Sequence, residues 1–327
     1  MQTKYGLLTY IEKNRFFNVG DYIQSLAAKQ FLQQVDEYIS REKLNSYDKG
    51  KTKLIMNGWF THNTQRWTPS DDIVPLFVSL HLNSMSAPYM LDEKGIAYLK
   101  KQEPIGCRDK YTVETLKAKG IDAYFTGCLT LTLDSYKVDD SERSDNIYIV
   151  DPLYSYPLKK VVFSSFRKFV KGIIMGEFFK LGKIKKHLRQ FIDDDILNNA
   201  CYAEQSISAK RCYSDADKFA MAEDLLHKYA RAKLVITSRI HCALPCLAMG
   251  TPVIFINGFD NIIDSCRFDG ILELFNYINV NSKTGAYSAN FPLNGKITKD
   301  IKIKNREKHL PLAKALKEKC NQFISNS

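Results

Sequence analysis

Short apolar runs alternate with helix-like segments along this chain, and the alternation comes in two blocks. The strands expected in the first block are 6–10, 53–56, 76–80, 104–107 and 123–125, and the expected helices are one that begins at Asp21, 92–101 and 109–120. The second block has expected strands at 147–150, 234–237 and 252–256 and expected helices at 215–232 and 243–249. This alternation is typical of βαβ units in a largely parallel sheet with helices on both faces.

A polar stretch at 139–145 separates the two blocks. We therefore predict an α/β fold of two Rossmann-like domains, residues 1–140 and 145–309, followed by a C-terminal helix at 310–327. The length of 327 residues is in keeping with two domains. Ligands of open α/β sheets bind at the carboxyl ends of the strands, so two such domains would face each other across one cleft.

The basic residues of the chain are concentrated in one segment. The net charge is +11, and the segment 159–189 carries ten basic residues and one acidic residue, a local charge of +9 that leaves +2 for the rest. The domain surfaces therefore lack the broad positive charge of a nucleic-acid binder, and we expect no nucleic-acid partner. Phenylalanines interleave with these lysines, which is typical of an interfacial helix on anionic lipid. The alternative is a solvated lid, or a helix that packs its phenylalanines inward.

The sequence has the features of a cytoplasmic protein, peripheral at the inner face of the membrane if the basic segment binds lipid. Its eight cysteines are scattered without a C-x-x-C pair, so we expect reduced thiols. The first residues lack the pattern of a signal peptide. A membrane span is not expected either, since no run of ~18 uncharged apolar residues occurs.

The strongest group of candidate site residues lies within 235–254. An apolar strand there leads into a polar turn, then into an apolar helix that ends at Gly250, and a further strand follows. The turn carries Ser238, Arg239 and His241 beside a helix N-terminus, whose free N–H groups favour an anion. Arginine can bind a carboxylate or a phosphate through two hydrogen bonds, and histidine titrates near neutrality, so the pair suits an anionic substrate and a proton transfer. The alternative is that Arg239 and His241 have structural roles only.

A second group of polar residues, Asn18, Asp21 and Gln24, surrounds a turn at Gly20 that enters the first helix. Glycine lets a ligand approach the backbone there, and the polar side chains are suited to bind it. The alternative is a plain helix N-cap at Asn18 or Asp21.

A third group, Arg108 and Asp109, follows another expected strand. Arg108 can supply a cation to the cleft, whereas Asp109 is suited to be a helix N-cap, an ion-pair partner of Arg108 or a catalytic base. His241, Cys242 and Cys246 are residue types that bind metals, but residues at i, i+1 and i+5 of a helix cannot converge on one tetrahedral ion, so we expect no metal site. The glycine-rich dinucleotide and P-loop motifs are also missing from the sequence.

Together, these three groups resemble the polysaccharide pyruvyl transferase family in their order, over most of the chain. The resemblance is most specific at 237–254, which has the family's strand, Arg-x-His turn, helix and Gly-x-Pro strand. The Asn-x-Gly-Asp at 18–21 matches the family's N-terminal signature, and the Arg-Asp at 108–109 matches its central helix. The sequence departs from the family pattern at 57–59, where Asn-Gly-Trp replaces a glycine-rich turn, and at 127–129, where Gly-Cys-Leu replaces an Asp-Pro pair.

The resemblance implies an enzyme that transfers a pyruvyl group from phosphoenolpyruvate to two hydroxyls of a sugar and so forms a cyclic ketal. The sugar would belong to a glycan or a lipid-linked oligosaccharide, as in capsule or exopolysaccharide biosynthesis. Two domains arranged as in GT-B glycosyltransferases are implied, with the acceptor on the N-terminal side and the donor on the C-terminal side. Phosphoenolpyruvate is then a substrate, and neither a metal nor a nicotinamide cofactor is required.

The site residues are expected from the same resemblance together with their chemistry. The donor carries a carboxylate and a phosphate, which need cations. The residues expected to bind the donor are Arg108, Ser238, Arg239 and His241. His241 is the candidate general acid, assisted by Arg239, and either Asp21 or Asp109 is suited to accept a hydroxyl proton. The residues expected at the acceptor are Asn18, Gly20, Asp21, Gln24 and Asn57.

Two other functions fit parts of the sequence. A GT-B-like glycosyltransferase that uses a nucleotide sugar would share the cleft and use Arg239 for the diphosphate, with Glu204 or Asp264 binding the ribose or base. A basic, glycan- or membrane-associated assembly factor could keep the fold without the chemistry. The presence of Arg108, Arg239 and His241 argues against the assembly factor.

Overall fold

The computed structural model describes residues 4–10, 16–60, 62–154, 156, 170, 173, 182–209, 213–259 and 265–326. Most of the basic segment 159–189 lies outside these residues, so its interpretation as a lipid-binding helix stays a prediction. Asp264 also lies outside them.

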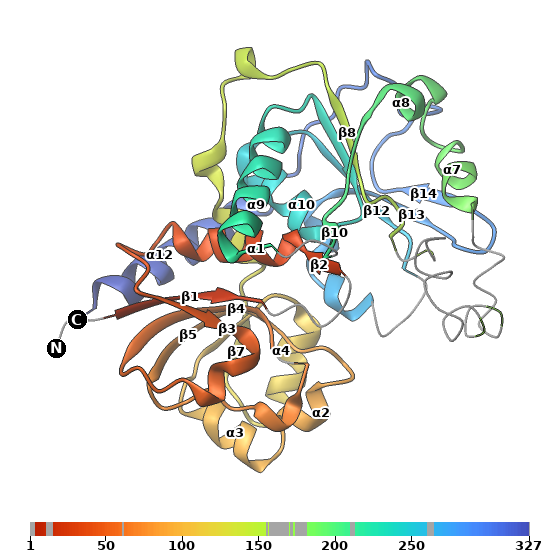
Figure 1. The fold of residues 1–327 in the computed structure, drawn as a ribbon. Coiled ribbons are helices and arrows are strands. Elements are labelled where there is room, and N and C mark those ends of the chain that lie inside the picture. The colour runs from red at the N-terminus through yellow and green to blue at the C-terminus, as the bar shows by residue number, and fades with distance from the viewer. Residues whose placement is uncertain are drawn as a thin grey trace.

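Two six-stranded sheets form the framework of the described residues (Figure 1). The first is parallel throughout, and its strands in spatial order are β3 (Glu37–Ser40), β1 (Lys4–Thr9), β4 (Thr52–Trp59), β5 (Ile73–His81), β6 (Ile105–Cys107) and β7 (Ala123–Phe125). The second is parallel except at one edge, and its order is β14 (Tyr287–Ala289), β13 (Asn276–Val280), β12 (Val253–Asn257), β11 (Leu234–Thr237), β8 (Ile147–Val150) and β9 (Cys201–Ala203). The predicted α/β class is confirmed.

The helices of the described residues lie between and outside the sheets (Figure 1). They are α1 (Val19–Lys29), α2 (Ala87–Met90), α3 (Glu93–Lys100), α4 (Lys110–Lys117), α7 (Lys183–Leu188), α8 (Asp194–Asn199), α9 (Asp215–Ala230), α10 (Ile240–Met249) and α12 (Leu310–Ser325). A short antiparallel pair, β2 (Phe16–Asn18) and β10 (Ser206–Ser208), connects the two halves of the chain just before α1.

Two helices at the site begin earlier than the sequence indicated. α1 begins at Val19 and not at Asp21, because Asn18 is its N-cap and accepts a hydrogen bond from the backbone N–H of Gly20 at 3.1 Å. α10 begins at Ile240 and not at 243, because Arg239 is extended and its carbonyl accepts from the N–H three and four residues later. His241 therefore lies in the first turn of a helix and not in the loop before it.

One hydrophobic core joins the two sheets. It includes Leu7 of β1, Ile23 of α1, Leu226 of α9, Leu244 of α10 and Val235 of β11. Figure 1 shows α1, α9 and α10 between the sheets. Two further clusters of buried hydrophobic residues, one for each sheet, pack on the outer faces of the sheets. Each fully buried aliphatic side chain stabilises the fold by about 1.5–3 kcal/mol, so this shared layer holds the two sheets together.

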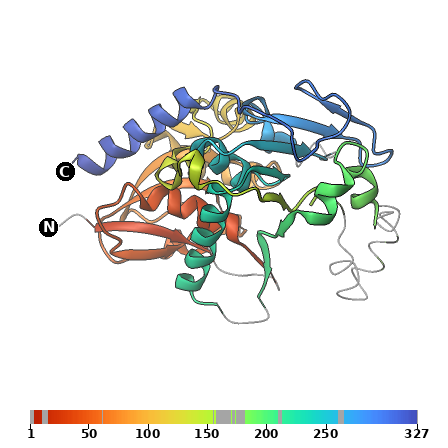
Figure 2. The ribbon, with the colours of Figure 1, turned by 90° about the horizontal axis from the view of Figure 1, so that it is seen from above.

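The C-terminal helix α12 packs against the first half of the chain. Leu316 and Cys320 belong to the shared core, and the Lys53 ammonium of β4 donates to the carbonyl of Phe323 at 2.9 Å, at the end of α12. Figure 2 shows α12 on the side of the first sheet. The N-terminal part of the helix lies beside the end of β7, at Phe125 and Thr126, and its C-terminal end lies beside Lys53 of β4.

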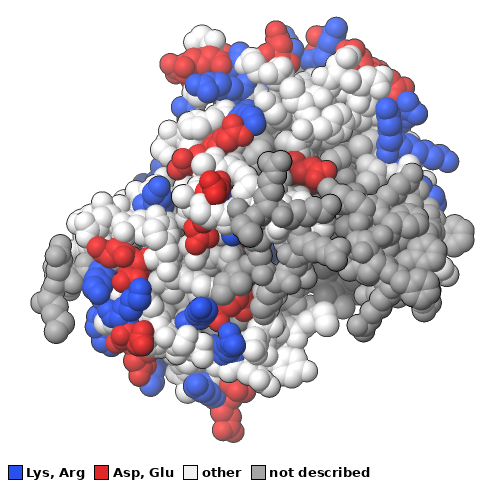
Figure 3. Space-filling model, in the orientation of Figure 1, with Lys and Arg blue, Asp and Glu red and all other residues white. Residues whose placement is uncertain are grey.

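Two features of the described residues concern a membrane: the character of the helices and the distribution of charge on one face. None of the helices in this part of the chain is both long enough and apolar enough to span a bilayer. On the face drawn in Figure 3, acidic and basic side chains are interspersed and do not form one basic patch.

Candidate active site

A cavity of about 350 Å³ lies where the carboxyl ends of strands from both sheets come together. Among the described residues, the basic, imidazole and acidic side chains that line it belong to four arginines, three histidines and one aspartate: Arg41, Arg108, Arg239, Arg267, His62, His81, His241 and Asp21. The other lining residues are Tyr10, Phe16, Phe17, Asn18, Tyr22, Trp59 and Asn83. Four guanidinium groups against one carboxylate make the cavity suited to an anionic ligand.

Arg108 is a buried cation with free hydrogen-bonding capacity. It directly follows β6, its backbone N–H donates to the carbonyl of Leu80 at 2.8 Å, and its side chain is 1% exposed. Its Nε and Nη2 find no hydrogen-bond partner among the described residues, and the nearest carboxylate oxygen, Oδ2 of Asp109, is 3.6 Å from Nε. Burial lowers the pKa of this guanidinium. A bound anion would supply the missing partners.

His81 and Asp109 form a buried pair beside Arg108. Nδ1 of His81 lies 2.7 Å from Oδ2 of Asp109, and Oδ1 of Asp109 accepts from the backbone N–H and the hydroxyl of Thr112. Asp109 is thus the N-cap of α4. Burial lowers the pKa of His81 to about 4, and the Arg108 charge acts in the same direction. His81 is therefore neutral near pH 7, with Nδ1 as the donor to Asp109.

Arg239 is held in place by a second carboxylate. Its Nε donates to Oδ2 of Asp151 at 2.8 Å, and its guanidinium lies over the ring of Tyr154, 3.9 Å from the centroid. Asp151 follows β8 with a φ of 41°, an uncommon value for a residue other than glycine. Its Oδ2 also accepts from the backbone N–H of Gln205 at 2.9 Å. These contacts fix one edge of the guanidinium while the group still lines the cavity.

His241 is buried and its Nε2 has no hydrogen-bond partner among the described residues. Pro245 has no N–H to donate to the His241 carbonyl, which instead accepts from Nε2 of Gln205 at 3.1 Å. Burial lowers the pKa of His241 well below its usual range, and the charges of Arg108, Arg267 and Arg239 lower it further. The imidazole is therefore neutral in the free protein, and a bound anion would raise its pKa.

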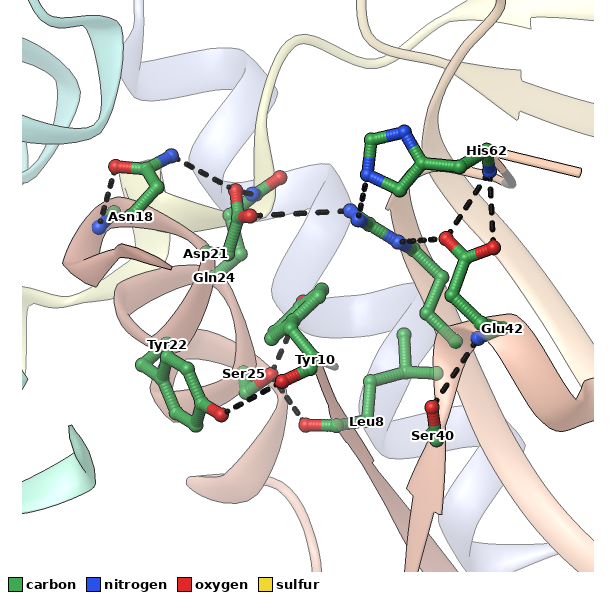
Figure 4. Close-up of polar contacts among 12 residues, drawn as sticks. Leu8, Tyr10, Asn18, Asp21, Tyr22, Gln24, Ser25, Ser40, Glu42 and His62 are labelled. Carbon is green, nitrogen blue, oxygen red and sulfur yellow. Dashed lines mark hydrogen bonds and ion pairs between the residues drawn. The ribbon is translucent and has the colours of Figure 1, made fainter. Parts of the chain in front are cut away.

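Asp21 is the carboxylate of the cavity, and it lies in the first turn of α1 (Figure 4). Its Oδ1 accepts from Nδ2 of Asn18 at 3.0 Å, and its Oδ2 is 3.9 Å from Nη1 of Arg41. Burial raises the pKa of this carboxyl, although Arg41 and the hydrogen bond from Asn18 act against the rise. A carboxylate with a raised pKa is a better proton acceptor near neutral pH.

Arg41 connects Asp21 with the aromatic wall of the cavity. Its guanidinium lies over the rings of Trp59 and Tyr10, 4.0 and 4.9 Å from their centroids. Nη2 of Arg41 is 3.4 Å from Nε2 of His62, and both carboxylate oxygens of Glu42 accept from the backbone N–H of His62 (Figure 4). The side chain of Arg41 is only 4% exposed, so these contacts hold it firmly.

A family model described as polysaccharide pyruvyl transferase matches residues 18–261, which is most of the chain. The chain belongs to this family. The matched range contains Asn18, Arg41, Arg108, Arg239 and His241, which all line the cavity.

One solved structure and this member of the family are similar over most of their lengths. A solved structure of a functionally uncharacterised protein from Klebsiella pneumoniae aligns with 82% of this chain and 88% of its own length, at 11% sequence identity and a TM-score of 0.42. No curated protein matches the sequence.

The fold of this family member brings together five of the predicted site residues. Arg108, Arg239, His241, Asn18 and Asp21 all line the cavity. A Cβ atom on Gly20 would lie 2.9 Å from Oε1 of Gln205 and 3.2 Å from Cβ of His241, so the glycine allows α1 to approach α10.

Four of the nine predicted site residues do not line the cavity: Gly20, Ser238, Gln24 and Asn57. Asp109, the alternative base, does not line it either. The hydroxyl of Ser238 donates to the carbonyl of Ile256 in β12 and accepts from the N–H of Leu153, so it connects this strand with the loop after β8. Gln24 is buried against Asp21, and Nδ2 of Asn57 donates to the Gln24 carbonyl at 2.8 Å. Glu204, the candidate nucleotide-binding carboxylate, is exposed and is not among the lining residues.

The sequence did not predict the other ten described lining residues, among them His81, Trp59, Arg41 and Arg267. His81 is the last residue of β5, so the rule that ligands bind at carboxyl ends of strands would have found it. Trp59 ends β4, which runs past its expected end at 56. Arg41 follows β3, which the sequence did not indicate, and Arg267 lies in a single 3₁₀ turn, Cys266–Phe268, after β12. Neither arginine stands in a sequence pattern that predicts a functional site.

Proposed function

We propose that the protein transfers a pyruvyl group from phosphoenolpyruvate to two hydroxyls of a sugar, with release of phosphate and formation of a cyclic ketal. Membership of the polysaccharide pyruvyl transferase family supports a transferase acting on glycans. The observation that carries the donor assignment is the cavity with Arg41, Arg108, Arg239 and Arg267 around it. Phosphoenolpyruvate presents a carboxylate and a phosphate, and Arg108 and Arg239 are the residues we assign to them.

The proposed chemistry begins with a proton transfer to carbon. His241 donates a proton to the donor's methylene carbon, which becomes a methyl group, and the first sugar hydroxyl forms a bond to the adjacent carbon. The bond from that carbon to the phosphate oxygen then breaks, phosphate leaves with the electron pair, and the second hydroxyl closes the ketal. Of the two hydroxyl protons, one replaces the proton that His241 gave and the other leaves with phosphate.

The pKa of His241 fits this role once the donor is bound. Burial and the charges of Arg108, Arg267 and Arg239 hold the pKa low in the free protein, and the negative charges of phosphoenolpyruvate would offset those charges. His241 would then take up a proton as the donor binds. Asp21, whose pKa is raised by burial, is the base in this proposal, and Asp109 orients His81.

We also propose a domain arrangement and a cellular location for the enzyme. The two sheets would correspond to GT-B-like domains, with 1–140 on the acceptor side and 145–309 on the donor side. We place the reaction in the cytoplasm, where phosphoenolpyruvate is made, and keep contact of 159–189 with the inner face of the membrane as part of the proposal.

Thermal unfolding with phosphoenolpyruvate, UDP and GDP tests the donor assignment. We expect phosphoenolpyruvate to raise the Tm of the wild type, since a ligand at ~100 times its Kd stabilises a protein by about 2.7 kcal/mol. UDP and GDP should leave the Tm unchanged. In Arg239→Ala the shift should disappear, because the guanidinium lines the cavity.

The matched control is Arg189→Ala, since Arg189 is half exposed and pairs with Asp194 away from the cavity. Its shift with phosphoenolpyruvate should equal that of the wild type. A shift with a nucleotide alone would favour the glycosyltransferase, and an undiminished shift in Arg239→Ala would place the donor elsewhere.

A further inference from the structure

An open groove adjoins the arginine-lined cavity. Its volume is about 510 Å³, and Trp59, His62 and Asn83 line both the groove and the cavity. The other lining residues of the groove are Thr64, Met85, Ser86 and Tyr89. A ligand long enough to occupy both spaces would pass along the Trp59 indole.

Two residues of this groove are apolar and unusually exposed. Met85 is 69% exposed and Tyr89 is 68% exposed. The backbone N–H of Met85 donates to Oδ1 of Asn83 at 2.9 Å, and Tyr89 belongs to α2, so both are positioned by the segment that follows β5. Exposed apolar groups beside a cleft gain free energy when a ligand covers them.

The polar groups of the groove differ in kind from those of the cavity. The described lining residues offer the hydroxyls of Thr64 and Ser86, the amide of Asn83 and the imidazole of His62, and none of them is Lys, Arg, Asp or Glu. A phosphate or carboxylate would find no cation there, whereas it would find four arginines in the cavity. A ligand with hydroxyls and an apolar C–H face matches both the polar and the aromatic groups.

We propose that this groove binds an uncharged pyranose of the acceptor glycan, next to the sugar that receives the pyruvyl group. The inference rests on the proposed function, because it takes the cavity to be the place of transfer. The C–H face of the pyranose packs on Tyr89 and Met85, and its hydroxyls bond to Asn83 and Thr64. The reacting sugar then lies past Trp59, near Asp21.

Trp59 is well suited to fix the boundary between groove and cavity. The guanidinium of Arg41 lies 4.0 Å from the centroid of the indole, and the ring of His62 meets it edge-on at 4.5 Å. Arg41 in turn pairs with Asp21 at 3.9 Å. The same buried cation therefore contacts the wall of the sugar groove and the proposed base.

Saturation-transfer difference NMR on the full chain tests the groove. The probes are lactose, cellobiose and maltose at millimolar concentration, with phosphoenolpyruvate present in excess. The wild type should transfer saturation to at least one disaccharide. Tyr89→Ala and Met85→Ala should weaken that binding by about three- to tenfold, the range expected for loss of a stacking contact. The control is Tyr202→Ala, at a tyrosine of β9 that is 58% exposed and outside the groove.

The phosphoenolpyruvate-induced rise in Tm, measured on the same variants, separates the two proposals. The proposal that the groove binds a pyranose would be overturned if both groove variants bound the sugar as well as the wild type. It would also be overturned if the wild type gave no signal with any of the three disaccharides. In either case a persisting Tm shift would leave the donor assignment intact. If the groove variants weaken sugar binding but phosphoenolpyruvate does not raise the Tm of the wild type, the groove is confirmed as a sugar site and the donor assignment is wrong. A stronger signal from cellobiuronic acid than from cellobiose would overturn the uncharged specificity.

Discussion

Replacing Arg108 with methionine is expected to make the free protein more stable. The guanidinium is buried, two of its nitrogens have no partner among the described residues, and burial lowers its pKa. Methionine fills similar space without a charge, and the nearby Asp109 keeps its hydrogen bonds with His81 and Thr112. Removal of two unsatisfied buried donors should therefore raise the free energy of unfolding by about 1–3 kcal/mol. Urea denaturation measures the change, and a loss of stability would instead assign Arg108 a structural role.

The same substitution should remove donor binding. Loss of one partner of a buried, charged hydrogen-bonded pair weakens binding by about two to three orders of magnitude. Calorimetric titration with phosphoenolpyruvate would show this loss, and Arg189→Met, which changes an exposed arginine, should change neither stability nor affinity. A variant that is more stable but no longer binds the donor would show that Arg108 is kept for function at the expense of stability.

Replacing His241 with glutamine is expected to lower the rate of transfer by about 10²- to 10⁴-fold, the usual contribution of a general acid. Affinity for phosphoenolpyruvate should stay within a few-fold of the wild type, because the arginines remain. The assay is release of phosphate from phosphoenolpyruvate, with the best-bound neutral disaccharide as acceptor. An unchanged rate would exclude His241 as the acid and direct attention to His81, which also lines the cavity.

The pH dependence of the wild type follows from the same assignment. A general acid must carry its proton, and burial with Arg108, Arg267 and Arg239 lowers the pKa of His241 in the free protein. Therefore kcat/KM, which reports the free enzyme, should fall as the pH rises through a value below 6.5, the ordinary pKa of histidine. The fall in kcat should come at higher pH, because the bound donor raises the pKa.

Site residues that closely follow a fully buried strand could be predicted from the sequence. Arg239 follows β11, whose four residues are all buried, and Arg108 follows β6, whose three residues are buried. Both strands read as apolar runs. Arg41 could not be found in this way, because β3 has one buried residue, Ile39, and no alternating pattern. Its role depends on contacts with Trp59 and Asp21 that only the folded chain creates.

The sequence was least informative about the direction in which loop side chains point. Ser238 and Arg239 are neighbours in one turn, yet the serine hydroxyl bonds to the backbone of β12 and of the loop after β8, and the arginine lines the cavity. Gln24 lies one helical turn after Asp21 but is buried beside it. Such differences arise from tertiary packing, since a hydroxyl or amide satisfies backbone groups as readily as a ligand.

Calorimetric titration of phosphoenolpyruvate into the full chain, in two buffers of different ionisation enthalpy, tests the central claim most directly. We predict that phosphoenolpyruvate binds, that UDP does not, and that donor binding near neutral pH takes up protons. The uptake should fall in His241→Gln, while binding persists. A pyruvyl transfer that starts from this histidine would be contradicted if UDP bound and phosphoenolpyruvate did not. It would also be contradicted if phosphoenolpyruvate bound without proton uptake, or with the same uptake in His241→Gln.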